Sequence, residues 1–197
     1  MQKSALIKSL LNYGFDEKII SAFRRINRED FVSAGNEDFA YDDMPLSIGY
    51  KQTISQPHTI AFMLKLLEVQ PGLKVLEVGS GSGYVLALLG ELLEGGEVYG
   101  VEIIPELFER SQEILKDFKN IKLFEAGESL GLSALAPFDR ILVSAAASEI
   151  PAELLKQLAE GGILVCPVKD DIVRIKKEKS GITKTFHHGF SFVPLIE

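Results

Sequence analysis

The sequence predicts an α/β fold built on a mostly parallel seven-stranded β-sheet, and three observations support this prediction. Residues 74–84 read in succession as a buried strand, a glycine-rich turn and the start of a helix. Between residues 57 and 168, short apolar strands alternate with helical segments, the order that produces a parallel sheet with helices on both faces. Polar side chains fall at the carboxyl ends of the predicted strands, the edge at which such sheets bind ligands: Glu77, Glu102, Glu128 and Ser144.

The composition is that of one globular domain. Of the 197 residues, 46% are hydrophobic and 25% are charged, which allows a substantial core. The formal net charge of −7 disfavours a nucleic-acid partner, because binding to phosphates requires a basic face. The basic clusters are therefore interpreted as solvated faces: Arg24 and Arg25 with Arg28, and Lys176 and Lys177 with Lys179.

Neither a membrane nor export is expected. No apolar run reaches the length of a membrane span, and the N-terminal residues lack the apolar core of a secretion signal. We therefore expect a monomer in the cytoplasm. The single cysteine, Cys166, excludes an internal disulfide framework and lies in the apolar run 163–166, which predicts a buried, unreactive thiol.

The N-terminal part is predicted to form a helical cap followed by a long loop. Apolar residues recur at helical spacing over 3–12 and 16–26, with Asp16 as a candidate N-cap. Residues 33–56 lose this periodicity and are rich in Gly, Asn, Asp, Pro and Ser. Loops of such length are uncommon unless they are functional. We therefore divide the single domain, 1–197, into a helical cap with its loop, 1–56, and a ligand-binding core, 57–197.

Helices and strands of the core alternate from Pro57 onward. Pro57 suits the first turn of a helix that ends at Leu67, and Ser55 or Gln56 lies near the cap of this helix. Strands are expected at 75–78, 97–103, 121–124, 138–145 and 162–168. Further helices are expected from residue 85, over 105–118 and over 151–159. Residues 172–178 and 182–193 are expected to complete the sheet as a hairpin.

The glycine-rich turn indicates the class of ligand. Glycine lacks a Cβ, so the backbone of such a turn can approach a ligand closely. A dinucleotide fingerprint needs G-x-G-x-x-G, whereas residues 79–83 are Gly-Ser-Gly-Ser-Gly and Tyr84 occupies the third glycine position. The Glu77 carboxylate would also repel a pyrophosphate, whereas it suits a ligand with an amine or hydroxyls and no phosphate.

A second acid, Glu102, ends the strand predicted over 97–103. It lies roughly 20 residues beyond the turn, the spacing expected for a carboxylate that binds ribose hydroxyls. An adenosine-containing ligand follows from this spacing, although NAD and S-adenosyl-L-methionine both predict such an acid.

Resemblances to a superfamily and to one family within it narrow the choice of ligand. Residues 77–83, Glu-Val-Gly-Ser-Gly-Ser-Gly, resemble the first motif of class I S-adenosylmethionine-dependent methyltransferases. Residues 45–50 followed by 52–57, Pro-Leu-Ser-Ile-Gly-Tyr and Gln-Thr-Ile-Ser-Gln-Pro, look like the signature loop of the protein-L-isoaspartate O-methyltransferase family. Further stretches resemble the same family, so that the likeness runs from about residue 25 to the end: 28–32, 138–147 with 149–151, and 192–195.

The resemblance implies a Rossmann-like class I methyltransferase fold. It also implies methyl transfer from S-adenosyl-L-methionine to the α-carboxylate of L-isoaspartyl residues in damaged proteins and peptides, with S-adenosyl-L-homocysteine as product. A carboxylate with a pKa of about 4 is already ionised at neutral pH, so neither a general base nor a metal is required. What remains is in-line alignment with water excluded. Ser55 matches the family's active-site serine and is expected to donate a hydrogen bond to the carboxylate, although a helix N-cap is a competing role.

The resemblance extends to the contact residues. The cofactor-binding residues are expected to be Thr53, His58, Glu77, Gly79, Ser80, Gly81, Ser82, Gly83, Glu102, Ile103 and Glu128. The substrate-binding residues are expected to be Ile54, Ala145, Ala146, Val193 and Pro194. For His58, a structural role in the first turn of a helix is an alternative to cofactor binding. For Ile103, a place in the hydrophobic core is the alternative. At 127–129 the chain has Gly-Glu-Ser where the family usually has Gly-Asp-Gly, so the carboxylate has a longer arm and a glycine is lost.

Three other functions stay open on the sequence alone. One is a class I methyltransferase that acts on another small-molecule or protein acceptor or on an RNA base; the loop at 45–58 argues against a generic small-molecule enzyme, and the low basicity argues against RNA. A module that binds the cofactor without turnover is disfavoured by the combination of Glu102, the glycine turn and Ser55. An NAD-dependent oxidoreductase is disfavoured by Tyr84 and Glu77.

Overall fold

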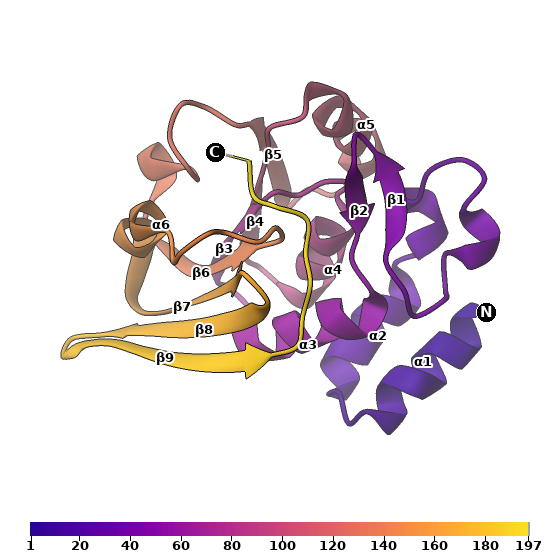
Figure 1. The fold of residues 1–197 in the computed structure, drawn as a ribbon, viewed down its shortest axis with the longest axis horizontal. Helices are drawn as coiled ribbons and strands as arrows, with labels where there is room; N and C mark the ends of the chain where they lie inside the picture. Colours follow the sequence, from indigo (N-terminus) through magenta and orange to yellow (C-terminus); the bar gives the residue numbers. More distant parts are fainter. Residues whose placement is uncertain (197) are drawn as a thin grey trace.

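The computed structural model describes residues 1–196 and confirms the predicted seven-stranded, mostly parallel sheet (Figure 1). Its strand order is β5-β4-β3-β6-β7-β8-β9. The five parallel strands are β3 (Lys74–Val78), β4 (Glu97–Glu102), β5 (Ile121–Glu125), β6 (Phe138–Val143) and β7 (Leu158–Val168). The antiparallel hairpin of β8 (Asp171–Glu178) and β9 (Gly181–His188) extends the sheet at one edge, as predicted.

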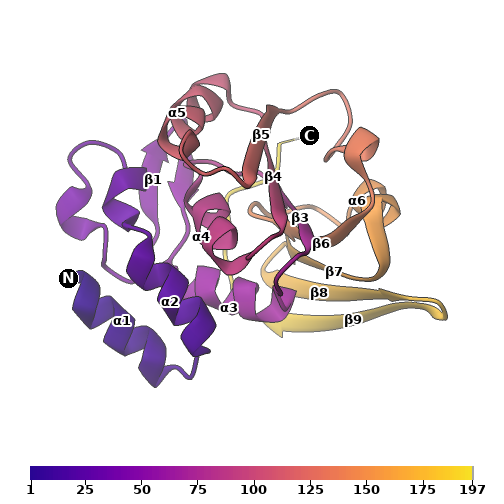
Figure 2. The ribbon, with the colours of Figure 1, turned by 180° about the vertical axis from the view of Figure 1, so that it is seen from behind.

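Helices cover both faces of the sheet, as predicted, but unequally. On one face pack α3 (Pro57–Leu67), α4 (Tyr84–Leu92) and α5 (Pro105–Leu115). The cap helices α1 (Lys3–Asn12) and α2 (Glu17–Arg25) form a second layer outside them, seen best from behind (Figure 2). On the other face lies the short α6 (Ala152–Gln157), with the segment that follows β5. No helix within residues 1–196 combines the length and the apolar character that a membrane crossing needs.

The sheet is buried on both faces, which explains the continuous apolar runs of its strands. Along β3, Val75 faces the helices α3 and α4, whereas Leu76 and Val78 face α6. Cys166 in β7 is fully buried on the α6 face. The predicted burial is thus confirmed, and it raises the pKa of the thiol to about 12.

The segment predicted as a loop over 33–56 contains secondary structure. The strands β1 (Leu46–Gly49) and β2 (Gln52–Ile54) form an antiparallel hairpin, and short 3₁₀ turns precede it at Arg28–Phe31 and Glu37–Phe39. At the hairpin tip Tyr50 and Lys51 have φ of +54° and +59°. Asparagine and glycine normally mark such a turn, so its sequence carried no hairpin signal.

Two boundaries at the end of the chain also differ from the prediction. The last strand ends at His188 instead of residue 193, because the N–H groups of Gly189 and Phe190 both donate to the carbonyl of Asp170 and leave the strand ladder. The chain then crosses the carboxyl ends of the parallel strands (Figure 1). Strand β7 begins at residue 158 instead of 162, beside an irregularity in its register with β6.

Candidate active site

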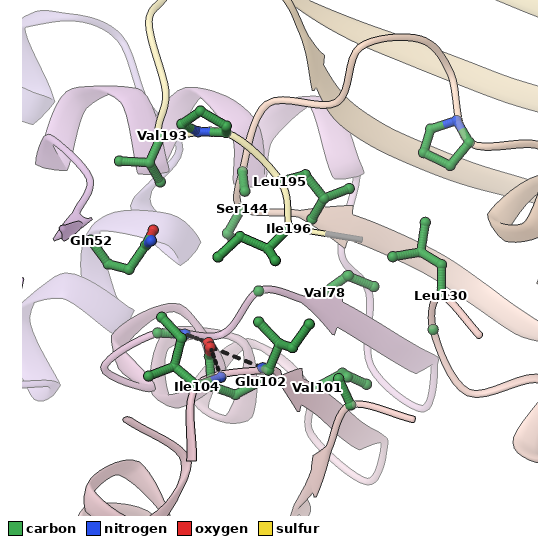
Figure 3. A pocket seen from close by; sticks show the side chains of 18 of the residues that line it. Gln52, Val78, Val101, Glu102, Ile104, Leu130, Ser144, Val193, Leu195 and Ile196 are labelled. Atoms are coloured by element: carbon green, nitrogen blue, oxygen red, sulfur yellow. Dashed lines mark hydrogen bonds between the residues drawn. The ribbon is translucent and has the colours of Figure 1, made fainter. Parts of the chain in front are cut away.

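A cavity of about 400 Å³ opens at the carboxyl ends of the parallel strands. A smaller cavity of about 40 Å³ adjoins it. Four residues line both: Thr53, Gly79, Gly81 and Ser144. In the close view of the large cavity, the C-terminal residues Leu195 and Ile196 lie on one side and Glu102 and Ile104 on the other (Figure 3).

The glycine turn forms the floor between β3 and α4. The N–H groups of Gly79 and Ser80 donate to the carbonyl of Val101 at 2.9 and 3.1 Å, which ties the turn to β4. Gly83 has φ +82°, and a Cβ at this position would lie 2.8 Å from Cδ1 of Leu115 in α5. Only glycine combines this backbone conformation with this close packing. The turn is thereby held between β4 and α5.

Glu102 is only 4% exposed, and backbone N–H groups hold its carboxylate in place. Its Oε2 accepts from Gly81 N–H at 2.6 Å (Figure 3). Its Oε1 accepts from Ile103 N–H at 3.0 Å and from Ile104 N–H at 2.9 Å. A carboxylate has about four acceptor positions, so Oε2 keeps capacity for a hydroxyl donor from the cavity. This is the property required of a ribose-binding acid.

Glu77 lies beneath the turn and is fully buried. The hydroxyl of Ser144 donates to its Oε1 at 2.6 Å, whereas Oε2 has no partner within residues 1–196. Burial raises the pKa of this carboxyl to about 8, the hydrogen bond from Ser144 opposes the shift, and the negative charge of Glu102 adds to it. An unpartnered buried acceptor calls for a donor, and a cationic ligand group fits that requirement.

The remaining walls suit an adenosine. Ile103 is 43% exposed and presents an apolar surface to the large cavity next to Glu102. Glu128 lines the same cavity beyond the end of β5, so its longer arm still reaches the site. Within residues 1–196, the two cavities are lined by no Asp, Lys, Arg or His but by five glutamates: Glu77, Glu102, Glu128, Glu149 and Glu153. Such a lining favours a ligand that carries positive charge.

Ser55 lies in the small cavity, immediately after β2. Its hydroxyl makes no hydrogen bond within the described chain. The competing N-cap role does not fall to Ser55, because the N-cap of α3 is Gln56, and the Asp43 carboxylate accepts from the N–H of His58 at 2.8 Å in the first turn. The hydroxyl of Ser55 therefore stays available to a ligand.

Most of the residues assigned by resemblance come together here. The large cavity is lined by Thr53, Gly79, Gly81, Glu102, Ile103, Glu128, Ala145, Val193 and Pro194. The small cavity adds Ile54, Ser55, Glu77, Ser80 and Ser82. Ala146 takes part through its backbone, because its N–H donates to Val193 O and its carbonyl accepts from Leu195 N–H, both at 2.8 Å. Gly83 lines neither cavity and acts through the shape of the turn.

His58 lies apart from the other residues expected to contact the cofactor. Its ring lies on the outer side of α3, with its centroid 4.4 Å from that of Tyr13 and 5.4 Å from that of Phe15. It lines neither cavity. Position 58, in the first turn of α3, thus faces the N-terminal cap, and the cofactor contact of His58 stays a prediction.

Sequence reasoning missed several residues of the site. Ile48 and Gln52 line the large cavity from the hairpin that was predicted as a loop. Arg28 was interpreted as part of a solvated face, but it is 0% exposed and its Nη1 donates to the carbonyl of Ser55 at 2.8 Å. Within residues 1–196, no group of three His, Cys, Asp or Glu side chains is placed to hold a metal ion.

Comparisons with known proteins show the family of this chain. The sequence model of the family described as protein-L-isoaspartate(D-aspartate) O-methyltransferase matches residues 1–197. A protein-L-isoaspartate O-methyltransferase of Methanothrix thermoacetophila is 43% identical over 203 residues, with 100% of this chain and 95% of the relative covered. The enzyme of the same name from Ignicoccus hospitalis is 41% identical, with 100% and 98% covered.

Solved structures show the same likeness. A Plasmodium falciparum protein assigned as a protein-L-isoaspartate O-methyltransferase, crystallised with S-adenosyl-L-homocysteine, is 29% identical with a TM-score of 0.87, and 100% of this chain and 99% of that one are covered. Another protein-L-isoaspartate O-methyltransferase structure gives a TM-score of 0.90 at 24% identity, with 100% of this chain and 66% of that one covered, which supports the fold.

Proposed function

This chain belongs to the protein-L-isoaspartate O-methyltransferase family, and we propose that its methyl transfer takes place where the small cavity meets the large one. The fold is that of a class I methyltransferase. The enzyme uses S-adenosyl-L-methionine and methylates the α-carboxylate of L-isoaspartyl residues in damaged proteins and peptides. What is proposed is which residues hold each reactant.

One observation carries the proposal: Ser55 and the glycine turn line the same small cavity. In the proposed arrangement, Glu102 binds the ribose hydroxyls through its free acceptor capacity, and Ile103 and Glu128 border the adenine. Glu77 faces the methionine end of the cofactor, where its unpartnered Oε2 accepts from the ammonium. The Ser55 hydroxyl then lies on the acceptor side of the turn.

The protein's contribution to the reaction is alignment. The bound cofactor supplies the methyl group on a sulfonium, whose sulfur leaves with the electron pair of the broken carbon–sulfur bond. Ser55 donates a hydrogen bond to the ionised acceptor carboxylate and holds one oxygen in line with that methyl group. Because no Lys, Arg or His lines the cavities within residues 1–196, the cofactor itself provides the positive charge that attracts this carboxylate.

The C-terminal segment completes the acceptor side of the site in this proposal. Val193 and Pro194 border the cavity beside Ala145, and the backbone bonds of Ala146 keep them there. Small residues at 145–147 let a peptide backbone come close. We further propose that the chain works as one domain and as a cytoplasmic monomer without nucleic acid or membrane. The net charge of −7 supports the part of this proposal that concerns nucleic acid.

Replacing Ser55 by alanine tests the proposed acceptor contact. A hydrogen bond to a charged group contributes about 1.5–3 kcal/mol, so Ser55→Ala should lower kcat/KM for an isoaspartyl peptide by about 10- to 100-fold. The dissociation constant of S-adenosyl-L-homocysteine should stay within about twofold of the wild-type value. Steady-state kinetics with a labelled cofactor and calorimetric titration measure the two quantities.

Ser47→Ala is the matched control, because Ser47 lies in β1 of the same hairpin but lines neither cavity. It should keep wild-type kinetics. An equal loss in the two variants, or an unchanged kcat/KM in Ser55→Ala, would count against the acceptor role of Ser55.

A further inference from the structure

Within residues 1–196, Arg28 is the largest side chain that is fully buried, and no carboxylate of that part of the chain is hydrogen-bonded to it. It begins the 3₁₀ turn Arg28–Phe31, beneath the hairpin of β1 and β2. Burial lowers the pKa of its guanidinium to about 10, whereas the nearby side chains of Tyr84 and Asp43 act in the opposite direction. A buried charge that is kept at such a cost must make contacts that a neutral side chain cannot make.

These contacts are two backbone carbonyls at the base of the hairpin. Arg28 Nη1 donates to the carbonyl of Ser55 at 2.8 Å, and Nη2 donates to the carbonyl of Met44 at 3.2 Å. The outermost strand pair of the hairpin joins Leu46 to Ile54, so Met44 and Ser55 flank its two ends. A single guanidinium therefore closes the base of the hairpin that carries Ile48 and Gln52 into the large cavity.

The guanidinium is itself anchored to the cofactor side of the site. Its Cζ lies 5.4 Å from the centre of the Tyr84 ring, a cation–π contact. Tyr84 is the first residue of α4 and directly follows the glycine turn. It is buried and is further packed by Phe23 and Phe31. Arg28 thus connects the segment that ends at Ser55 to the helix that begins at the turn.

We propose that Arg28 is a positioning residue for the methyl transfer. By holding the Ser55 carbonyl and the base of the hairpin, Arg28 fixes the position of Ser55 relative to the glycine turn. The proposal rests on the acceptor role given to Ser55 under Proposed function. It deepens that role by naming what places the hydroxyl, since Ser55 itself belongs to no helix or strand.

Arginine is specifically suited to this task. Its planar fork presents two N–H groups in fixed directions to two carbonyls, while its charge lies over an aromatic ring. Lysine keeps the charge but offers a single ammonium on a flexible stem, so it cannot reproduce the geometry of both bonds together with the cation–π contact. Arg28→Lys should therefore keep a buried cation while loosening the segment 44–55.

The test combines Arg28→Lys with the Ser55→Ala background. Arg28→Lys should lower kcat/KM for an isoaspartyl peptide about tenfold or more, while the dissociation constant of S-adenosyl-L-homocysteine changes less than about threefold. In Ser55→Ala protein, the same Arg28→Lys change should lower kcat/KM by less than about twofold, because Arg28 acts through Ser55. A loss that is equal in both backgrounds would overturn the proposal.

Arg140→Lys is the matched control for stability. Arg140 is also a buried arginine whose Nε and Nη1 donate to backbone carbonyls, those of Glu68 and Asp139, and it lines neither cavity. Its change to lysine should lower the melting temperature without lowering kcat/KM. If Arg140→Lys lowers kcat/KM as much as Arg28→Lys at a matched melting temperature, the positioning role is wrong.

Hydrogen exchange provides a readout that does not depend on turnover. Arg28→Lys should speed amide exchange at 44–56 while the strands β3 and β4 keep wild-type protection; unchanged exchange at 44–56 would overturn the proposal. The two proposals fail separately. Wild-type activity of Ser55→Ala would contradict the acceptor role, whereas an impaired Ser55→Ala beside a fully active Arg28→Lys would contradict the positioning role alone.

Discussion

Replacement of Glu102 by alanine should weaken the binding of S-adenosyl-L-homocysteine by at least about 100-fold. The carboxylate accepts three backbone N–H groups, from Gly81, Ile103 and Ile104, and is proposed to accept the ribose hydroxyls as well. Hydrogen bonds to a charged acceptor contribute about 1.5–3 kcal/mol each, and 100-fold corresponds to about 2.7 kcal/mol. Alanine removes the ligand contacts and releases the glycine turn at once.

Isothermal titration calorimetry measures this loss, with Glu106→Ala as the control. Glu106 is an exposed carboxylate on α5 that lines neither cavity, so its removal changes the net charge equally without touching the site. Glu106→Ala should bind the ligand as the wild type does. Retention of wild-type affinity by Glu102→Ala would show that the ribose site lies elsewhere.

The affinity for S-adenosyl-L-homocysteine should rise with pH by up to about tenfold per unit below pH 8. Glu77 in the empty protein has a pKa raised to about 8, so it is mostly protonated at neutral pH. The ligand's ammonium favours the ionised carboxylate, and binding at pH 7 should therefore release a proton from Glu77. Calorimetry in buffers of different ionisation enthalpy measures both the affinity and the number of protons released.

Glu77→Gln separates this effect from the titration of the ligand itself. The variant should bind with an affinity that depends little on pH between 6 and 8, and its binding should release no proton from position 77. An identical pH dependence in Glu77→Gln and in the wild type would contradict the assignment of Glu77 to the charged end of the cofactor.

The same carboxyl affects the stability of the empty protein. Its folded pKa of about 8 lies above the ordinary value of 4.5, so the folded protein holds more protons than the unfolded chain between these two values. Stability therefore falls as the pH rises through this window, and Glu77→Gln should remove that part of the fall in melting temperature. In the wild type, bound S-adenosyl-L-homocysteine should diminish this pH-dependent fall in melting temperature.

The central part of the site could be predicted from sequence because its signals are local. A buried strand, a glycine turn and a helix start follow one another over residues 74–84, and Glu102 ends the next strand. Parallel strands in one sheet then place the polar strand ends at a common edge. The structure confirms these elements, and their grouping around the cavities follows from the topology alone.

The parts that could not be predicted depend on contacts between distant segments. Arg28 sits in a sequence rich in charges, and only the packing of the hairpin and α4 above it shows that it is buried. His58 follows the loop of the active site, but the direction of α3 turns it away. The N-cap of that helix is Gln56, as the sequence allowed, but the carboxylate that accepts from its first turn belongs to Asp43, 15 residues before His58.

The most direct test of the account is a methyl-transfer assay with labelled S-adenosyl-L-methionine on two matched peptides, one with L-isoaspartate and one with aspartate. We predict alkali-labile label on the isoaspartyl peptide alone, as expected for a methyl ester. Absence of label from both peptides, with S-adenosyl-L-homocysteine binding intact, would contradict the account and direct the search to other acceptors.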